Sequence, residues 1–315
     1  MSGAAVLASV RDLCVVYRRG GRDVRALRGV SVDLTRGRVT ALVGESGSGK
    51  STLGLALVGL LPHNARVERG AVSFEGRELR GEELWREVRG SGIAWQPQDA
   101  LAALDPLMNV LDAVAEGPCF ADGLAPMVAQ ARARTALERA GFACDDPALL
   151  RFPHGLSGGQ RLRVAFAAAI AREPRVLIAD EPTAALDAPL ALRTTALLRD
   201  LAERGSAVLW ITHDLALAAH AAHEIAVIYA GRIVEIGAAR QVVATPRHPY
   251  TALLLAVARS YEPAPAATMR AESGCAFRGR CPLARVSCAT SEPELVELAG
   301  GRKVACPFHA EVRVP

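Results

Sequence analysis

Residues Gly44 to Ser51 read Gly-Glu-Ser-Gly-Ser-Gly-Lys-Ser and fit the pattern G-x-x-x-x-G-K-[ST]. The apolar run 38–43 before them is typical of a buried strand, and the Leu/Ala-rich segment 52–61 is typical of a helix that stops at Pro62. Between a strand and a helix, glycines let backbone N–H groups converge on an anion, and the helix dipole adds its positive end. The chain is therefore predicted to bind phosphate groups at this loop.

Two side chains of the loop have specific predicted roles. The Lys50 ammonium can reach the β- and γ-phosphates of a nucleotide, and the Ser51 hydroxyl can ligate Mg²⁺. Lysine occurs only at positions 50 and 303 of this arginine-rich chain, so a compact point charge stands where phosphate binding needs one. The residues predicted to contact the nucleotide here are Gly44, Ser46, Gly47, Gly49, Lys50, Ser51 and Thr52.

Composition limits the class of protein. With 315 residues, half of them hydrophobic, the chain can form one large α/β domain with an appendage. A net charge of +4, spread along the chain, argues against nucleic acid as the partner. Residues 1–9 do not look like a secretory signal, and no apolar run approaches the ~20 residues of a membrane span, so we expect a soluble or peripheral protein. Seven cysteines in such a chain predict thiols or metal ligands rather than disulfides.

The order of predicted elements indicates one nucleotide-binding domain. Strands alternate with helices from 175 to 236, which predicts parallel pairing in a doubly wound sheet. Helical periodicity dominates from 106 to 172, so we expect an all-helical insertion between two halves of the sheet. Further strands are predicted at 6–17, 26–34, 71–74 and 92–95, the last two being joined by a polar connection.

A second apolar run, Val176 to Glu181, ends in two carboxylates. Ligands of parallel α/β sheets bind beyond the carboxyl ends of the strands, so both acids are expected near Lys50 and Ser51. We predict that Asp180 holds Mg²⁺ and that Glu181 polarises the water that attacks the γ-phosphate.

The segment Leu156-Ser157-Gly158-Gly159-Gln160 predicts a second anion site, because a Ser and two glycines begin a helix there. At these residues the chain resembles the ATP-binding subunits of ABC transporters, whose signature is LSGGQ, and the resemblance covers about Val6 to Gly237. It implies a P-loop NTPase fold: an α/β domain with a mostly parallel core sheet, an antiparallel β part and a helical insertion. It also implies that residues 157–160 bind the γ-phosphate held by a partner subunit.

The same resemblance assigns four further residues. Tyr17 corresponds to the aromatic that stacks on adenine, although a half-buried strand Tyr is the alternative. Gln98 corresponds to the glutamine that senses Mg²⁺ and whose loop contacts the membrane subunit, with Gln96 as a rival. His213 corresponds to the γ-phosphate-sensing histidine, and Asp187 ends the D-loop Ala185-Leu186-Asp187.

The tail resembles the C-terminal extension of the oligopeptide/dipeptide branch, through His248-Pro249-Tyr250-Thr251 and four spaced cysteines. Gly59-Leu60-Leu61-Pro62 suggests the D-type subunit of that branch. Four cysteines within about thirty residues predict a metal site, with four structural thiols as the alternative. The resemblance implies a [4Fe–4S] cluster, with zinc as the second candidate. The expected ligands are Cys275, Cys281, Cys288 and Cys306.

These likenesses imply an ATP-hydrolysing subunit that powers an importer of di- or oligopeptides. Alternatives are an importer of nickel, metal chelates or another small solute, and a soluble ABC ATPase. The implied partners are a second, F-type or identical ATPase subunit, two transmembrane permease subunits and an extracytoplasmic solute-binding protein. The implied location is the cytoplasmic face of the inner membrane. We predict a nucleotide-binding domain over 1–245, with the helical subdomain at about 106–172, and an extension over 246–315 that includes a linker at 262–267.

Overall fold

A computed structural model describes residues 5–184, 186–260 and 273–313. Within them the central sheet runs parallel from β9 (Glu224–Tyr229) through β3 (Val39–Val43), β8 (Ala207–Thr212) and β7 (Val176–Asp180) to β6 (Ile93–Gln96), and the strands on the other side of β9 are antiparallel. Strands β3, β7 and β8 are buried along their whole length, as expected of parallel strands covered on both faces. The strands on the other side of β9 are, in order, β10 (Arg232–Ala238), β12 (Lys303–Val304) and β11 (Val296–Glu297).

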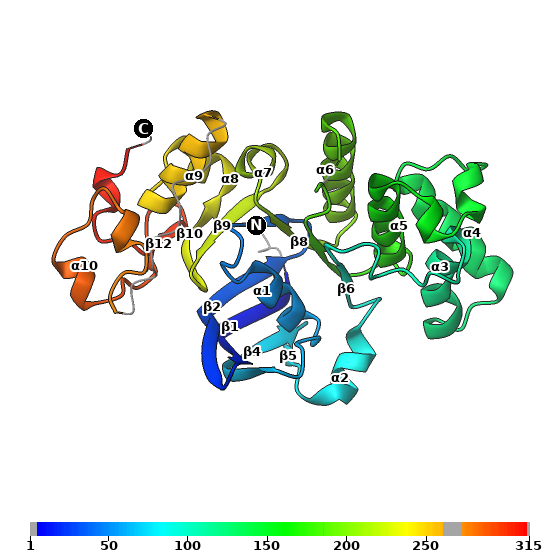
Figure 1. The fold of residues 1–315 in the computed structure, drawn as a ribbon, viewed down its shortest axis with the longest axis horizontal. Coiled ribbons are helices and arrows are strands. Elements are labelled where there is room, and N and C mark those ends of the chain that lie inside the picture. Colours follow the sequence, from blue (N-terminus) through cyan, green and yellow to red (C-terminus); the bar gives the residue numbers. More distant parts are fainter. Residues whose placement is uncertain (1–4, 185, 261–272, 314–315) are drawn as a thin grey trace.

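A second, antiparallel sheet packs against one face of the central sheet (Figure 1). The helix α1 (Lys50–Leu57) contributes Leu53 and Leu57 to the core between the two sheets. This confirms the antiparallel part of the expected ABC ATPase fold. The order of its strands is β2 (Arg22–Thr35), β1 (Val6–Arg19), β4 (Ala65–Phe74) and β5 (Arg77–Glu78).

Two local predictions near α1 were wrong. The helix predicted to reach Leu61 ends at Leu57, because Gly59 takes a left-handed backbone (φ +64°) against the ring of Trp85. The connection predicted to be merely polar contains α2 (Gly81–Val88), whose Leu84, Trp85 and Val88 pack against the core. Its apolar residues lie on one face of the helix, but Glu and Arg outnumber them, so composition alone indicates a polar connection.

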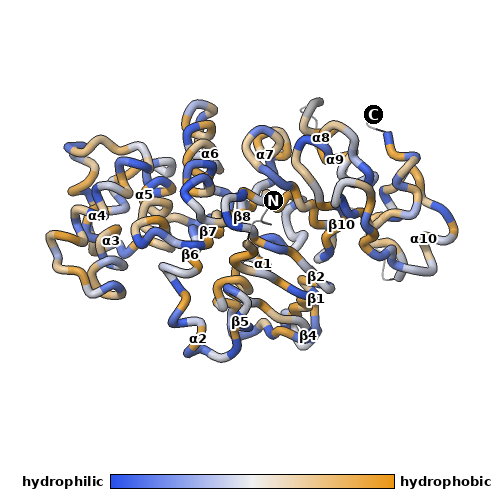
Figure 2. The backbone as a smooth tube through the Cα atoms, turned by 180° about the vertical axis from the view of Figure 1, so that it is seen from behind, coloured by the Kyte–Doolittle hydropathy of each residue, from blue (hydrophilic) through white to orange (hydrophobic). Residues whose placement is uncertain are grey.

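The helical insertion lies between β6 and β7. It comprises α3 (Val110–Glu116), α4 (Pro126–Arg139) and α5 (Gly158–Ile170), which form one end of the molecule in Figure 1. The tube of α4 and α5 alternates between hydrophobic and hydrophilic colours in Figure 2, as expected of amphipathic helices. Their apolar side chains join the core on the other face of the central sheet, together with α6 (Ala188–Glu203) and α7 (Leu215–Ala221).

The C-terminal extension lies at the opposite end of the molecule and continues the central sheet (Figure 1). After α8 (Ala239–Ala244) and α9 (Pro249–Ser260), the chain reaches α10 (Ser287–Thr290) and then returns as β12, which pairs with β10. The linker predicted at 262–267 lies outside the described residues. In the described ranges, the helices are all too short or too polar to cross a bilayer.

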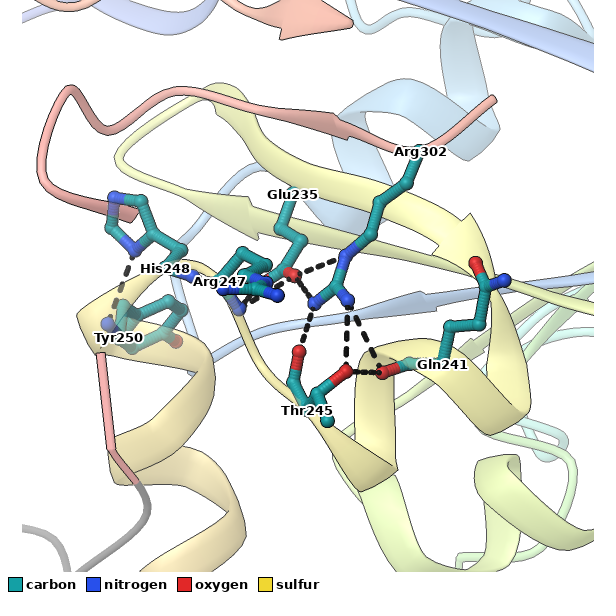
Figure 3. A network of polar contacts seen from close by, with 7 residues as sticks. All are labelled: Glu235, Gln241, Thr245, Arg247, His248, Tyr250 and Arg302. Carbon is teal, nitrogen blue, oxygen red and sulfur yellow. Dashed lines mark hydrogen bonds and ion pairs between the residues drawn. The ribbon is translucent and has the colours of Figure 1, made fainter. Parts of the chain in front are cut away.

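A buried polar network joins this extension to β10 (Figure 3). The Glu235 carboxylate, fully buried, accepts hydrogen bonds from the Arg302 guanidinium and from the backbone N–H groups of Arg247 and His248. Burial lowers the pKa of His248 to about 3, so its ring is neutral and Nδ1 accepts from the Tyr250 N–H at 3.1 Å. The network therefore fixes the start of α9 against the sheet.

Candidate active site

Three segments with predicted functional residues leave the central sheet at one edge. In the parallel register Val43 pairs with Thr212, and Asp180 pairs with Ile211. The phosphate loop, Glu181 and His213 follow directly on these strand ends. The topology thus brings together the residues that the sequence predicts beyond the carboxyl ends of β3, β7 and β8.

The phosphate loop leads directly into the first turn of α1. Gly49 has φ +110°, and a Cβ there would lie 2.8 Å from the carbonyl oxygen of Ala26, so a side chain would strain the loop. The Lys50 ammonium donates to the carbonyls of Gly44 at 2.7 Å and Glu45 at 3.0 Å. Burial lowers the pKa of Lys50, while the nearby carboxylates of Glu181 and Asp180 oppose the shift. The loop therefore places a cation beside the first helical N–H groups.

Asp180 and Ser51 provide oxygen ligands of the kind Mg²⁺ prefers. Burial raises the pKa of Asp180, and a hydrogen bond with the Ser51 side chain counteracts part of that rise. The Oδ1 atom of Asp180 is buried and has no hydrogen-bond partner among the described residues. An orphaned carboxylate oxygen beside a hydroxyl fits a cation with oxygen ligands, so these residues suit Mg²⁺.

Glu181 has a left-handed backbone conformation, with φ +50°, which is uncommon for a residue that carries a Cβ. Its N–H donates to Ile211 O at 2.9 Å, and its carbonyl accepts from Ala184 N–H at 3.0 Å. Its carboxylate oxygen Oε2 lies 3.2 Å from Nδ1 of His213, whose side chain is 68% exposed. The tight turn after β7 therefore directs the Glu181 side chain toward the strand end of β8.

A cleft of about 360 Å³ lies beside these groups, within the size range of ligand sites. The Tyr17 hydroxyl is 3.4 Å from Thr52 Oγ1, so the ring stands over the start of α1. Gln98 faces the cleft, whereas Gln96 is buried and its amide donates to Pro97 O. The lining residues are Tyr17, Arg19, Val24, Arg25, Ala26, Ser46, Gly47, Gly49, Lys50, Ser51, Thr52, Gln98 and Glu181.

The signature residues lie outside this cleft. Ser157 caps α5: its hydroxyl accepts from the Gln160 N–H, and the Gln160 side chain accepts from the Ser157 N–H. Around Gly158 there is open space where a Cβ would stand. Asp187 caps α6 by accepting from Leu190 N–H, while Ala185 lies outside the described residues. A single chain therefore does not bring residues 157–160 or Asp187 to its own phosphate loop.

The four cysteines of the tail lie near one another. The Cys275 N–H donates to Cys288 O at 2.8 Å, and burial, with contributions from the other three thiols, raises the pKa of Cys306 to about 11. Yet in the described parts of the chain no three His, Cys, Asp or Glu side chains are arranged so that they could hold a metal ion. The thiols have the chemistry of a metal site, but the expected metal-binding geometry is not supported.

Sequence reasoning missed a contact between the phosphate loop and the C-terminal extension. The Glu45 carboxylate pairs with Arg280, and the Glu45 N–H donates to the Tyr250 hydroxyl. Glu45 is a variable position of the loop pattern, so the pattern itself assigns it no role. The sequence marks Tyr250 only as part of the tail resemblance, and no local signal links it to a residue more than two hundred positions earlier.

With its helical insertion between β6 and β7, the central sheet is that of a P-loop nucleotide-binding cassette. The model of a family described as ABC transporter matches residues 27–184, and the chain belongs to this family. Residues 234–288 match a second family model, described as oligopeptide/dipeptide transporter, C-terminal region. The sequence-based resemblance to the oligopeptide/dipeptide branch is thereby confirmed.

Individual relatives agree with this placement. The chain is 39% identical to the oligopeptide transport ATP-binding protein OppD of Mycobacterium tuberculosis, over 95% of this chain and 51% of that protein. It is 38% identical to a putative peptide import ATP-binding protein of Brucella ovis, over 95% of this chain and 97% of that protein. It thus spans about half the length of the first relative and nearly all of the second.

A solved structure shares the fold. It is a dimeric ATP-binding cassette in a post-hydrolysis state, bound to ADP and Pi, with a TM-score of 0.67 and 27% identity. The match covers 74% of this chain and 99% of that one. The P-loop ABC ATPase fold expected from the sequence is confirmed.

Proposed function

We propose that this chain is the ATP-binding and ATP-hydrolysing subunit of an ABC importer for di- or oligopeptides. The convergence of Lys50, Asp180, Glu181 and His213 at one edge of the sheet, beside a cleft that ends at the phosphate loop, carries the proposal. The names of the relatives and the family match over 234–288 support peptides as the cargo.

The chemistry assigned to the site follows from its charges. Lys50 and the N–H groups of the loop bind the β- and γ-phosphates, while Ser51, Gln98 and Asp180 hold Mg²⁺, which neutralises charge on the phosphate oxygens. Glu181 accepts a proton from the attacking water, and His213 contacts the γ-phosphate. The Tyr17 ring stacks on adenine at the outer end of the cleft.

The signature residues act on a second chain. Ser157, Gly158, Gly159 and Gln160 lie away from the cleft of their own chain and start an α-helix whose N–H groups suit an anion. Two ATPase subunits therefore pair head to tail, with Asp187 at their contact. The second subunit is a related F-type chain or an identical one. The pair binds two permease subunits at the cytoplasmic face of the inner membrane, and an extracytoplasmic protein supplies the peptide.

The proposal predicts that ATP hydrolysis depends on pairing. The specific activity with Mg²⁺ and ATP should rise with the concentration of the chain or on addition of a related ATPase subunit, because each cleft lacks its anion-binding complement. Steady-state phosphate release over a dilution series measures this dependence. Full-speed turnover by the isolated monomer, with no dependence on concentration or on a companion, would contradict the scheme.

We also propose a [4Fe–4S] cluster on Cys275, Cys281, Cys288 and Cys306, with zinc as the alternative. The spacing of four cysteines within about thirty residues, the contact between the Cys275 N–H and Cys288 O, and the Cys-Pro pairs at 281–282 and 306–307 support it. Binding would draw the four sulfur atoms closer together than they now lie. The cluster is assigned no step in hydrolysis.

The cluster can be tested by its composition. Chain purified without oxygen should contain equal amounts of iron and acid-labile sulfide and absorb visible light. Cys288→Ser should lose both signals, whereas Cys144→Ser, at an exposed cysteine of the helical insertion, should keep them. Zinc without iron would support the alternative, and the absence of any metal would leave four structural thiols.

A further inference from the structure

The phosphate loop is held from outside the nucleotide cleft by a residue of the C-terminal extension. The Arg280 guanidinium makes two parallel hydrogen bonds with the Glu45 carboxylate, each 2.9 Å long. The Arg280 side chain is only 6% exposed, so the pair is shielded from water on the arginine side. A bidentate, largely buried pair of this kind fixes both position and direction.

A second contact holds the same loop residue through its backbone. The Tyr250 hydroxyl, at the start of α9, accepts the Glu45 N–H at 2.8 Å. Tyr250 is fully buried, and its ring packs against Phe277, with ring centroids 5.4 Å apart. Phe277 lies beneath Arg280 in the turn that carries it, so both contacts with Glu45 belong to one packed cluster.

The residue that is held does not itself line the cleft, but its neighbours do. Ser46 and Gly47 follow Glu45 directly and line the cleft. The Glu45 carbonyl accepts from the Lys50 ammonium at 3.0 Å and from the Ser48 N–H at 3.1 Å. The position of the Glu45 peptide therefore sets the position of the groups that meet the phosphates.

The extension also contacts a second element beside the cleft, the strand β2. The Glu292 carboxylate pairs with Arg28 on β2 at 2.6 Å and with Arg232 on β10 at 2.9 Å. Arg28 lies two residues after Ala26, which lines the cleft. The extension thus contacts both the phosphate loop and the strand β2, each of which lines the nucleotide cleft.

We propose that the C-terminal extension positions the phosphate loop for nucleotide, through Arg280 and Tyr250 acting on Glu45. The inference rests on the proposed function, because it assigns to these residues an effect on the affinity of that same site. Arg280 and Tyr250 are positioning residues, since neither lines the cleft. Coupling between two sites is reciprocal. If the contacts of the extension raise the affinity for nucleotide by a given factor, bound nucleotide must stabilise those contacts by the same factor.

The test compares nucleotide affinity among full-length variants. Arg280→Gln and Glu45→Gln should each raise the Kd for ATP by about tenfold, within the usual range of coupling between two sites. The double variant should be no weaker than the single ones, because either substitution already breaks the pair. Arg280→Lys should recover part of the lost affinity, since lysine keeps the positive charge but cannot make the two parallel hydrogen bonds of the guanidinium.

Arg285→Gln is the matched control. Arg285 belongs to the same extension but pairs with Glu311 at exposed positions. Its substitution should change the Kd for ATP by less than about twofold, as exposed pairs contribute little. Amide hydrogen exchange over 275–290 should slow when ADP binds the wild-type or Arg285→Gln chain, and should not slow in Arg280→Gln.

The outcomes separate the inference from the proposed function. Wild-type affinity in both Arg280→Gln and Glu45→Gln would overturn the inference, and so would an equal loss in Arg285→Gln, which would indicate general destabilisation of the extension. A wild-type chain that binds no nucleotide would overturn the proposed function and the inference with it. Glu45→Gln lies in the cassette itself, so it tests the pair even if Arg280→Gln does not fold.

Discussion

Glu181→Gln should bind ATP as tightly as the wild-type chain and hydrolyse it about 10²–10⁴-fold more slowly, the usual contribution of a positioned general base. The amide keeps the size of the carboxylate but cannot take a proton from water. The substitution does not alter the backbone groups that hold residue 181, whose N–H donates to Ile211 O and whose carbonyl accepts from the Ala184 N–H. Because ATP then persists in both clefts, the closed pair of subunits should accumulate. Single-turnover phosphate release and size-exclusion chromatography with ATP measure the two effects.

Glu173→Gln offers a matched control for this experiment. Glu173 is also a glutamate with a left-handed backbone, at φ +51° against +50° for Glu181, but it is exposed and does not line the cleft. Its substitution should leave turnover within about twofold, as surface changes usually do. Unimpaired turnover in Glu181→Gln would refute the role of that residue as the base. Equal loss in both variants would point to a general loss of active protein instead.

The central part of the site could be predicted because its signals are local. A phosphate loop between a buried strand and a helix needs only about twenty adjacent residues to be recognised, and parallel strands must place their carboxyl ends together. Asp180 is the last residue of an apolar strand, and Glu181 and His213 each follow directly on one. Their proximity to Lys50 therefore follows from topology alone.

Other features could not be predicted because they depend on contacts distant in sequence. Nothing near Glu45 indicates that Arg280 will pair with it, and nothing near β10 indicates that β12 will extend the sheet beside it. The left-handed backbone of Glu181 has no sequence signal either, since such strain persists only where tertiary contacts impose it. The spacing of the tail cysteines predicts a compact module but not the positions of its sulfur atoms.

Arg302→Ala should reduce the free energy of unfolding by about 3–5 kcal/mol, the cost of leaving one partner of a buried ion pair alone. Glu235 is fully buried, and the Arg302 side chain is only 6% exposed. The guanidinium also donates to Thr245 O at 2.6 Å and Gln241 O at 3.3 Å, at the end of α8 (Figure 3). Its loss leaves the buried Glu235 carboxylate without its cationic partner and removes these contacts with the end of α8. Urea unfolding followed by circular dichroism measures the change.

Two comparisons decide whether the buried charge is the cause. Arg204→Ala removes an arginine that is itself 66% exposed and pairs with the partly exposed Asp200, and should cost no more than about 0.5 kcal/mol. The double variant Glu235→Gln/Arg302→Met should be more stable than Arg302→Ala, because no uncompensated charge then remains buried. If the double variant were instead the less stable of the two, the packing and hydrogen bonds of these side chains would outweigh their charge. Because Glu235 also binds the N–H groups of Arg247 and His248 at the start of α9, that result would make the carboxylate the anchor of the extension.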